Sequence, residues 1–101
     1  MSTDAVVEKS PQVFEKNRVP KKYKVIFIND NVTPAEFVIV LLIKIFKHNE
    51  AVAKDLTLKV HNEGSAVVGL YFYEIAEQKT VESVHLARSN GFPLEIKIEP
   101  E

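Results

Sequence analysis

The chain has 101 residues, no cysteine and a formal net charge of −1. This length allows one domain with a single hydrophobic core, and the lack of cysteine excludes a disulfide framework and any thiolate metal site. The near-neutral charge gives no basis for electrostatic capture of nucleic acid. Apolar residues make up 46% of the chain and charged residues 27%, as is ordinary for a soluble globular protein.

We expect residues 1 to 22 to form a flexible N-terminal tail, because they mix charges with two prolines and show no sustained periodicity. The first ten residues lack the long apolar stretch of a secretory signal. The longest apolar run, residues 37 to 43 (FVIVLLI), is far shorter than the ~20 residues of a membrane-spanning helix. We therefore expect a cytoplasmic protein with no membrane segment.

The pattern tightens at Tyr23, and residues 23 to 101 are predicted to fold as one core domain. Residues 23 to 28 (YKVIFI) are short and rich in β-branched and aromatic side chains. This composition is typical of a strand, so the domain is predicted to begin with one.

A helix is predicted to follow, over residues 34 to 47. Thr33 would cap its free N–H groups, Pro34 suits its first position, and Glu36 would complete a capping box. The capping box favours a helix here, whereas the apolar run that follows would by itself also suit a strand. Since this helix is apolar nearly all round, other elements must cover it on more than one side.

A second helix is predicted over residues 50 to 61. Asn49 can cap its start, and Gly64 can end it in the left-handed conformation. An apolar residue at every fourth position predicts its buried stripe, formed by Val52, Leu56 and Val60.

The rest of the chain predicts a strand over residues 65 to 74, a helix over residues 76 to 90 and a last strand over residues 93 to 99. Apolar and charged residues alternate in the last strand, as in a half-buried one. The order is therefore β-α-α-β-α-β. It predicts an α+β fold, a small two-layer α/β sandwich with a three-stranded, mostly antiparallel sheet and helices packed on one face.

Residues that could carry catalysis or bind a metal are sparse. The three glycines are scattered, so there is no phosphate-binding loop, and there is no HExxH sequence. His48, His61 and His85 lie far apart, and none has a ligand partner three or four residues away. We therefore expect no cofactor, no metal and no enzymatic activity; a metal- or histidine-dependent enzyme is a distant third hypothesis.

The cluster Asn29-Asp30-Asn31 has two interpretations. These residue types favour turns, so the cluster could simply connect the first strand to the first helix. However, if the first two helices run antiparallel, the cluster comes near His61, with Val38, Val60 and Leu94 as apolar neighbours. Hydrogen-bond acceptors around an apolar pit suit a ligand that carries a cation beside a hydrophobic group.

Three stretches of the sequence, YKVIFINDNVTPAEFV, LKVHNEGSAVVG and EIAEQKTVESVHLARSNGFPL, resemble the ClpS family of bacterial Clp protease adaptors. The resemblance runs from Tyr23 to Glu99. It implies an adaptor that is not an enzyme and that binds the free N-terminus of substrates beginning with Leu, Phe, Tyr or Trp. It also implies delivery of these substrates to a ClpA-type or ClpC-type AAA+ unfoldase for degradation by ClpP, and we assume a monomer.

The resemblance also implies roles for individual residues. Asn29, residue 31 and His61 would hold the α-ammonium group, which has three donors and no acceptor. Glu74 and Lys79 would belong to the face that docks on the unfoldase N-domain, and the tail would be engaged during hand-off. The pocket for the first side chain would be formed by Asp30, Thr33, Ala35, Val38, Thr57, Val60 and Leu94.

The sequence departs from the family pattern at three of these positions. Asn31 stands where many members have Asp, so it brings an acceptor without a charge. Ala35 stands where a bulky Met usually rims the pocket, and the smaller rim predicts that Ile and Val are also admitted as first residues. Thr57 replaces another Met or aliphatic residue, which predicts a smaller and more polar wall.

Two hypotheses of different kinds follow. An adaptor of this family needs a free α-amino group on its ligand, and it should bind less tightly at pH 5.5 than at pH 8, because a protonated His61 can no longer accept. The alternative is a non-catalytic interaction module, either a Clp modulator or a domain like the C-terminal domain of the ribosomal stalk protein, which the sandwich resembles at fold level. In a module of this kind, Asn29→Ala would change stability but no ligand affinity.

Overall fold

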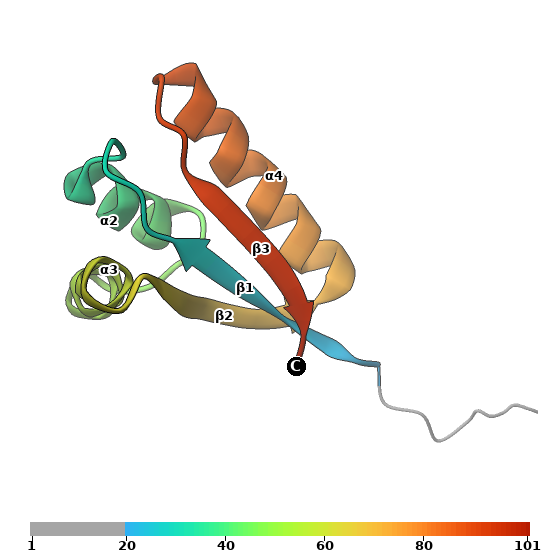
Figure 1. Cartoon of the computed structure of the whole chain (residues 1–101). Helices are drawn as coiled ribbons and strands as arrows, with labels where there is room; N and C mark the ends of the chain where they lie inside the picture. The colour runs from blue at the N-terminus through green and yellow to red at the C-terminus, as the bar shows by residue number, and fades with distance from the viewer. Residues whose placement is uncertain (1–19) are drawn as a thin grey trace, which may run out of the picture.

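The computed structural model describes residues 20–101. The order of elements is β-α-α-β-α-β, as predicted (Figure 1). All but the last three residues of the predicted tail lie outside the described residues. The elements are β1 (Lys22–Ile28), α2 (Ala35–Lys44), α3 (Glu50–Glu63), β2 (Ser65–Phe72), α4 (Tyr73–Ser89) and β3 (Glu95–Pro100).

The three strands form one sheet in the order β2-β1-β3, and both pairings are antiparallel. The central strand β1 turns Val25 and Phe27 into the core, where both are completely buried. The long helix α4 contacts all three strands, whereas α3 contacts β2 and α2 packs on α3 (Figure 1). This arrangement confirms the predicted α+β class and the antiparallel sheet.

A β-bulge interrupts the pairing of β1 with β2. Val25 pairs with Gly69 and Ile26 pairs with Val67, so Val68 is the extra residue. Val68, only 2% exposed, faces the core on the same side as Ala66, and the extra residue shifts the alternation so that Tyr71 also packs against the core. A Cβ at Gly69 would lie 2.5 Å from the Tyr71 ring, so the glycine allows this ring to lie across the strand.

The predicted capping box at the start of α2 is wrong. The helix begins at Ala35 with Pro34 as its N-cap residue, and no side chain caps it. Thr33 lies outside the helix, where its hydroxyl donates to Oδ2 of Asp30 at 2.8 Å. The charged carboxylate of Asp30 is a stronger acceptor than a neutral group, and it engages Thr33 in the loop.

The C-terminal end of α2 also differs from the prediction, because the helix stops at Lys44 rather than Lys47. The chain then turns so that Phe46 is buried edge-on against Phe27, with ring centroids 5.4 Å apart. Lys47 takes up a positive φ of 62°, which ends the helical path.

The apolar helix α2 is covered on more than one side, as predicted. On one side it contacts α3. At its start, Phe37 packs edge-on against Phe92 from the segment between α4 and β3, with centroids 4.9 Å apart. These contacts fix where the first turn of α2 lies.

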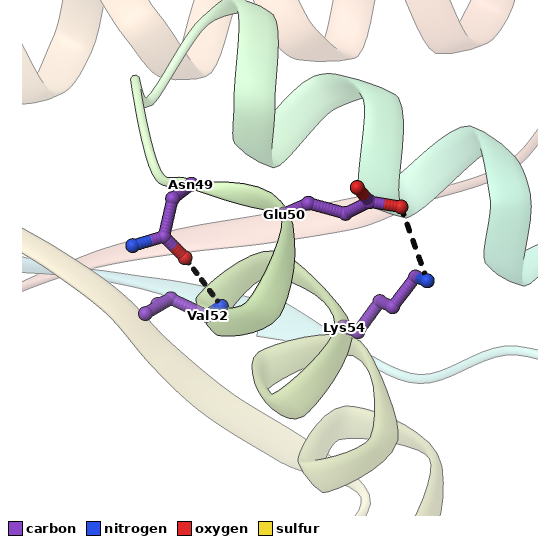
Figure 2. A network of polar contacts seen from close by, with 4 residues as sticks. All are labelled: Asn49, Glu50, Val52 and Lys54. Atoms are coloured by element: carbon purple, nitrogen blue, oxygen red, sulfur yellow. Dashed lines mark hydrogen bonds and ion pairs between the residues drawn. The ribbon is translucent and has the colours of Figure 1, made fainter.

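The two predicted capping residues of α3 are confirmed, although the helix runs to Glu63, two residues beyond the predicted end. The Asn49 side chain accepts a hydrogen bond from the Val52 N–H at 2.8 Å (Figure 2), and Gly64 ends the helix with φ of 89°. The predicted buried stripe is wrong at Val52, which is 39% exposed. A strict spacing of four residues drifts by about 40° per step around a helix of 3.6 residues per turn. The stripe instead alternates steps of four and three, with Ala53, Thr57 and Val60 buried.

Candidate functional site

The end of β1 is tied to the end of α3 by a backbone hydrogen bond. The Asn29 N–H donates to the Gly64 carbonyl at 2.9 Å, one step beyond the pairing of Ile28 with Ser65. Asn29 therefore lies beside the last turn of α3, which carries His61. The cluster after β1 thus comes close to His61 in space, as the antiparallel arrangement predicted.

A cavity of about 530 Å³ opens at this junction, between the cluster, α2 and α3. Its volume is in the range of small-molecule sites, ~300–1,000 Å³. Its lining exposes more apolar than polar surface, although seven of the lining residues carry polar or charged side chains. The lining residues are Asn29, Asp30, Asn31, Thr33, Ala35, Val38, Ile39, Lys54, Thr57, Leu58, Val60 and His61.

The structure brings together all but one of the residues predicted for the ligand site. The exception is Leu94, which does not line the cavity and is buried in the core at 1% exposure. Three lining residues were not predicted: Ile39, Lys54 and Leu58. Helical spacing could have found two of them, because Ile39 follows Ala35 by four residues and Leu58 precedes His61 by three.

The polar end of the cavity is formed by Asn29, Asn31 and His61, all of which are exposed. None of the side-chain hydrogen bonds formed within residues 20–101 involves these three side chains. Their oxygen and nitrogen acceptors are therefore available to a ligand with several N–H donors.

Asp30 organises the loop that carries the two asparagines. Its Oδ1 accepts from the backbone N–H groups of Val32 at 2.8 Å and Thr33 at 2.7 Å, in addition to the hydroxyl bond at Oδ2. Partial burial acts to raise the pKa of Asp30. The hydrogen bonds from Thr33 and Val32, together with the positive charge of Arg88, outweigh burial and hold the pKa below its ordinary value. Asp30 is therefore an ionised carboxylate that is already paired within its own loop.

The floor of the cavity is apolar. Val38 and Val60 are 6% and 5% exposed, and Thr57 between them in the lining is 8% exposed. The Thr57 hydroxyl donates to the Ala53 carbonyl at 2.8 Å within α3. Since this bond satisfies its donor, Thr57 is a less polar wall than the sequence predicted.

The two residues predicted for unfoldase docking lie in different environments. Glu74 is exposed in the first turn of α4, beside a shallow groove that Glu77, Val81 and His85 also line. The Lys79 ammonium is turned inward, where Nζ donates to the Ile45 carbonyl at 2.7 Å. Its Nζ also lies 5.9 and 5.4 Å from the ring centroids of Phe46 and Tyr71. Lys79 thus contributes to the packing of α4 against the end of α2.

Within residues 20–101, no three histidine or acidic side chains are grouped so that they could hold a metal ion. None of the helices in this part of the chain has the length and apolar character to cross a membrane. One of the histidines, His48, has Nε2 within 2.6 Å of the Val68 carbonyl, a contact that links the chain after α2 to β2.

Known proteins are similar to this chain in sequence and in fold. Residues 18–97 match the family model of the ATP-dependent Clp protease adaptor protein ClpS. ClpS adapter proteins of Nautilia profundicola and Treponema denticola are 44% and 41% identical, over 98% and 91% of both chains. The structure of Agrobacterium tumefaciens ClpS2 bound to L-phenylalaninamide matches with a TM-score of 0.79 and 42% identity, over 82% of this chain and all of that one. The chain therefore belongs to the ClpS family of adaptor proteins of the ATP-dependent Clp protease.

Proposed function

We propose that this adaptor binds the free N-terminus of proteins with a bulky hydrophobic first residue, and delivers them to a Clp unfoldase in the bacterial cytoplasm. The observation that carries the proposal is the cavity itself, in which the polar side chains of Asn29, Asn31 and His61 adjoin an apolar floor. The ligand of the Agrobacterium protein, L-phenylalaninamide, pairs an α-amine with an aromatic side chain, which is the same chemistry.

The α-ammonium group is assigned to the polar end of the cavity. An ammonium has three donors and no acceptor, which matches the acceptors of Asn29, Asn31 and neutral His61. Asn31 is uncharged, and Asp30, the only carboxylate that residues 20–101 contribute to the lining, is already paired in its loop. The site therefore recognises the ammonium mainly by hydrogen bonds and less by opposite charge, and a substrate with an acetylated N-terminus does not bind.

The first side chain is assigned to the apolar floor formed by Val38, Thr57 and Val60. Asp30, Thr33 and Ala35 line the same cavity and complete this pocket. Because Ala35 leaves the rim small, the pocket admits Ile and Val in addition to Leu, Phe, Tyr and Trp. Leu94 is not assigned to this pocket, since it does not line the cavity.

The delivery step requires contact with the N-domain of a ClpA-type or ClpC-type unfoldase. The exposed Glu74 is available for such a contact. Lys79 takes part through its position in α4, since its ammonium is engaged with Ile45. The protein acts without catalysis of its own.

Fluorescence anisotropy with labelled peptides that differ only in the first residue tests the proposal. The first residue is Leu, Phe, Tyr, Trp, Ile, Val or Arg, and every peptide has the same uncharged sequence after it. The proposal predicts binding of the hydrophobic members, including Ile and Val, and no binding of the peptide that begins with Arg. Equal affinity for all peptides, or binding of none, would contradict it.

A further inference from the structure

Lys54 lines the cavity, and the proposed function leaves it without a role. It shares one face of α3 with Leu58 and His61, at positions i, i+4 and i+7, and all three line the cavity. Seven residues of helix correspond to about 10 Å along the axis. The ammonium of Lys54 therefore belongs to the opposite end of the cavity from the site assigned to the α-amine.

The present partner of Lys54 is a carboxylate that solvent can replace. Its Nζ lies 3.1 Å from Oε2 of Glu50, one turn earlier in the helix (Figure 2). The two side chains are 60% and 71% exposed, and ion pairs that are this well solvated are weak. Glu50 is not part of the cavity lining, so another carboxylate at the cavity can compete for the same ammonium.

The lining side chains give the Lys54 end a positive charge, because Glu50, the partner of Lys54, lies outside the lining. Among residues 20–101, the lining contains one carboxylate, Asp30, whose oxygens accept hydrogen bonds within the loop, and Asn31 adds no charge. Within the same residues, Lys54 is the one lysine or arginine of the lining. A ligand that matches this arrangement carries its positive charge at the His61 end and a negative charge toward Lys54.

We propose that Lys54 is a specificity-determining residue that favours N-termini with an acidic residue at the second or third position. This inference rests on the proposed function and identifies a subclass of its ligands. An extended chain advances ~3.3 Å per residue, so the second and third residues leave the cavity within a few ångströms of the first. The side chains of Lys and Glu are both long and flexible, which favours an ion pair between Lys54 and an acidic residue at these positions.

The test uses three labelled peptides that begin with Phe and carry Glu, Gln or Lys at both the second and third positions. For the wild-type protein we expect the Glu peptide to bind about two- to fivefold more tightly than the Gln peptide, and the Lys peptide to bind least tightly. The preference should shrink in 0.5 M salt, because the charges are exposed.

Three variants assign the effect to Lys54. Lys54→Gln should remove the preference while keeping the affinity for the Gln peptide, and Lys54→Glu should reverse it. Glu50→Gln should enlarge the preference, because it frees Lys54. The matched control is Lys59→Gln, which removes the same charge from an exposed position of α3 that does not line the cavity.

The possible failures differ from one another. If all three peptides bind with equal affinity, or if Lys59→Gln removes the preference as fully as Lys54→Gln, the inference about Lys54 is wrong while the proposed function stands. The circular dichroism spectra of the wild type and the variants show whether the proteins are folded. If the proteins are folded and none of the three peptides binds, both the proposed function and the inference are wrong.

Discussion

The hydrogen bond from the Asn29 N–H to the Gly64 carbonyl, 2.9 Å long, joins the first residue after β1 to the residue that ends α3. Gly64 reaches this position through its left-handed backbone, with φ of 89°. Strand pairing, helix termination and the ligand site therefore meet at one point.

Replacing Gly64 by Ala should therefore weaken both the fold and the site. Non-glycine residues adopt the left-handed conformation at a cost of about 1 kcal/mol, although nothing in the surroundings blocks a Cβ at this position. We expect the free energy of unfolding to fall by about 1 kcal/mol, measured by urea denaturation. Gly64→Asn should lose less, because Asn tolerates this conformation better. An equal loss for both variants would contradict the backbone argument.

Asp30→Ala should destabilise the protein by about 2 kcal/mol, because it removes the acceptor of three hydrogen bonds in the loop. It should also weaken peptide binding, since Asp30 holds the loop in place and Asn29 and Asn31 are its neighbours in the chain. Urea denaturation and anisotropy measure the two effects. A variant that binds as well as the wild type would show that the loop does not need this carboxylate.

The ionisation of Asp30 also predicts how stability depends on pH. Its pKa is lowered from the ordinary 3.8 in the folded state, so its contribution is fully present above that value and is lost as pH falls below it. Between pH 5 and pH 2.5, the free energy of unfolding of the wild type should therefore fall more steeply than that of Asp30→Asn. Parallel curves for the two proteins would mean that the carboxylate is not stabilised by folding.

Lys79→Met should lower the free energy of unfolding by about 1–2 kcal/mol. The variant keeps an apolar stem of similar length but leaves the Ile45 carbonyl without its donor and removes the cation above Tyr71. Glu74→Gln serves as the comparison, because this exposed side chain should change stability by less than ~0.5 kcal/mol. If only Glu74→Gln reduces binding to the unfoldase N-domain, while Lys79→Met alone reduces stability, the division of roles is correct. The reverse pattern would contradict it.

His61→Ala should weaken peptide binding several-fold, because it removes one of the three acceptors assigned to the α-ammonium group. His61→Gln should lose less affinity, because its amide oxygen can still accept a hydrogen bond. The control His85→Gln, on the exposed face of α4, should behave as the wild type. Anisotropy with a free peptide that begins with Phe measures these affinities, and wild-type affinity in His61→Ala would exclude His61 from this role.

Ala35→Met should narrow the specificity of the pocket. Ala35 lines the cavity, and a longer side chain there restores a steric barrier at the rim. We expect affinity for peptides beginning with Ile or Val to fall at least tenfold, within the range for small steric differences in a pocket, with little change for Phe. Anisotropy with the first-residue panel provides the measurement, and a uniform change for all peptides would argue against a steric rim.

Local signals in the sequence predicted the element order well. Asn49 and Gly64 mark the two ends of α3, and both act as expected because capping depends on neighbouring backbone groups alone. The capping box predicted at Thr33 does not form, and the cause is again a neighbour in the chain. Asp30, three residues earlier, is a stronger acceptor for the Thr33 N–H and hydroxyl, and the pattern TPAE does not include it.

Long-range packing explains what the sequence could not predict about the site. Leu94 precedes β3 and was assigned to the pocket by resemblance, but it is buried in the core instead. The burial of Phe46 against Phe27, which ends α2 early, joins residues that are far apart in the chain. Lys54 was overlooked because a charged residue on a helix usually marks a solvated face, and only the three-dimensional structure places it at the cavity.

The most direct test of the account compares two forms of one peptide that begins with Phe, one with a free and one with an acetylated N-terminus. Anisotropy is measured with the wild-type protein and with Asn29→Ala. We expect saturable binding of the free peptide to the wild type, at least tenfold weaker binding to the correctly folded variant, and no binding of the acetylated peptide to either. If both forms bind the wild type equally, the cavity does not recognise a free N-terminus and the proposed function is wrong.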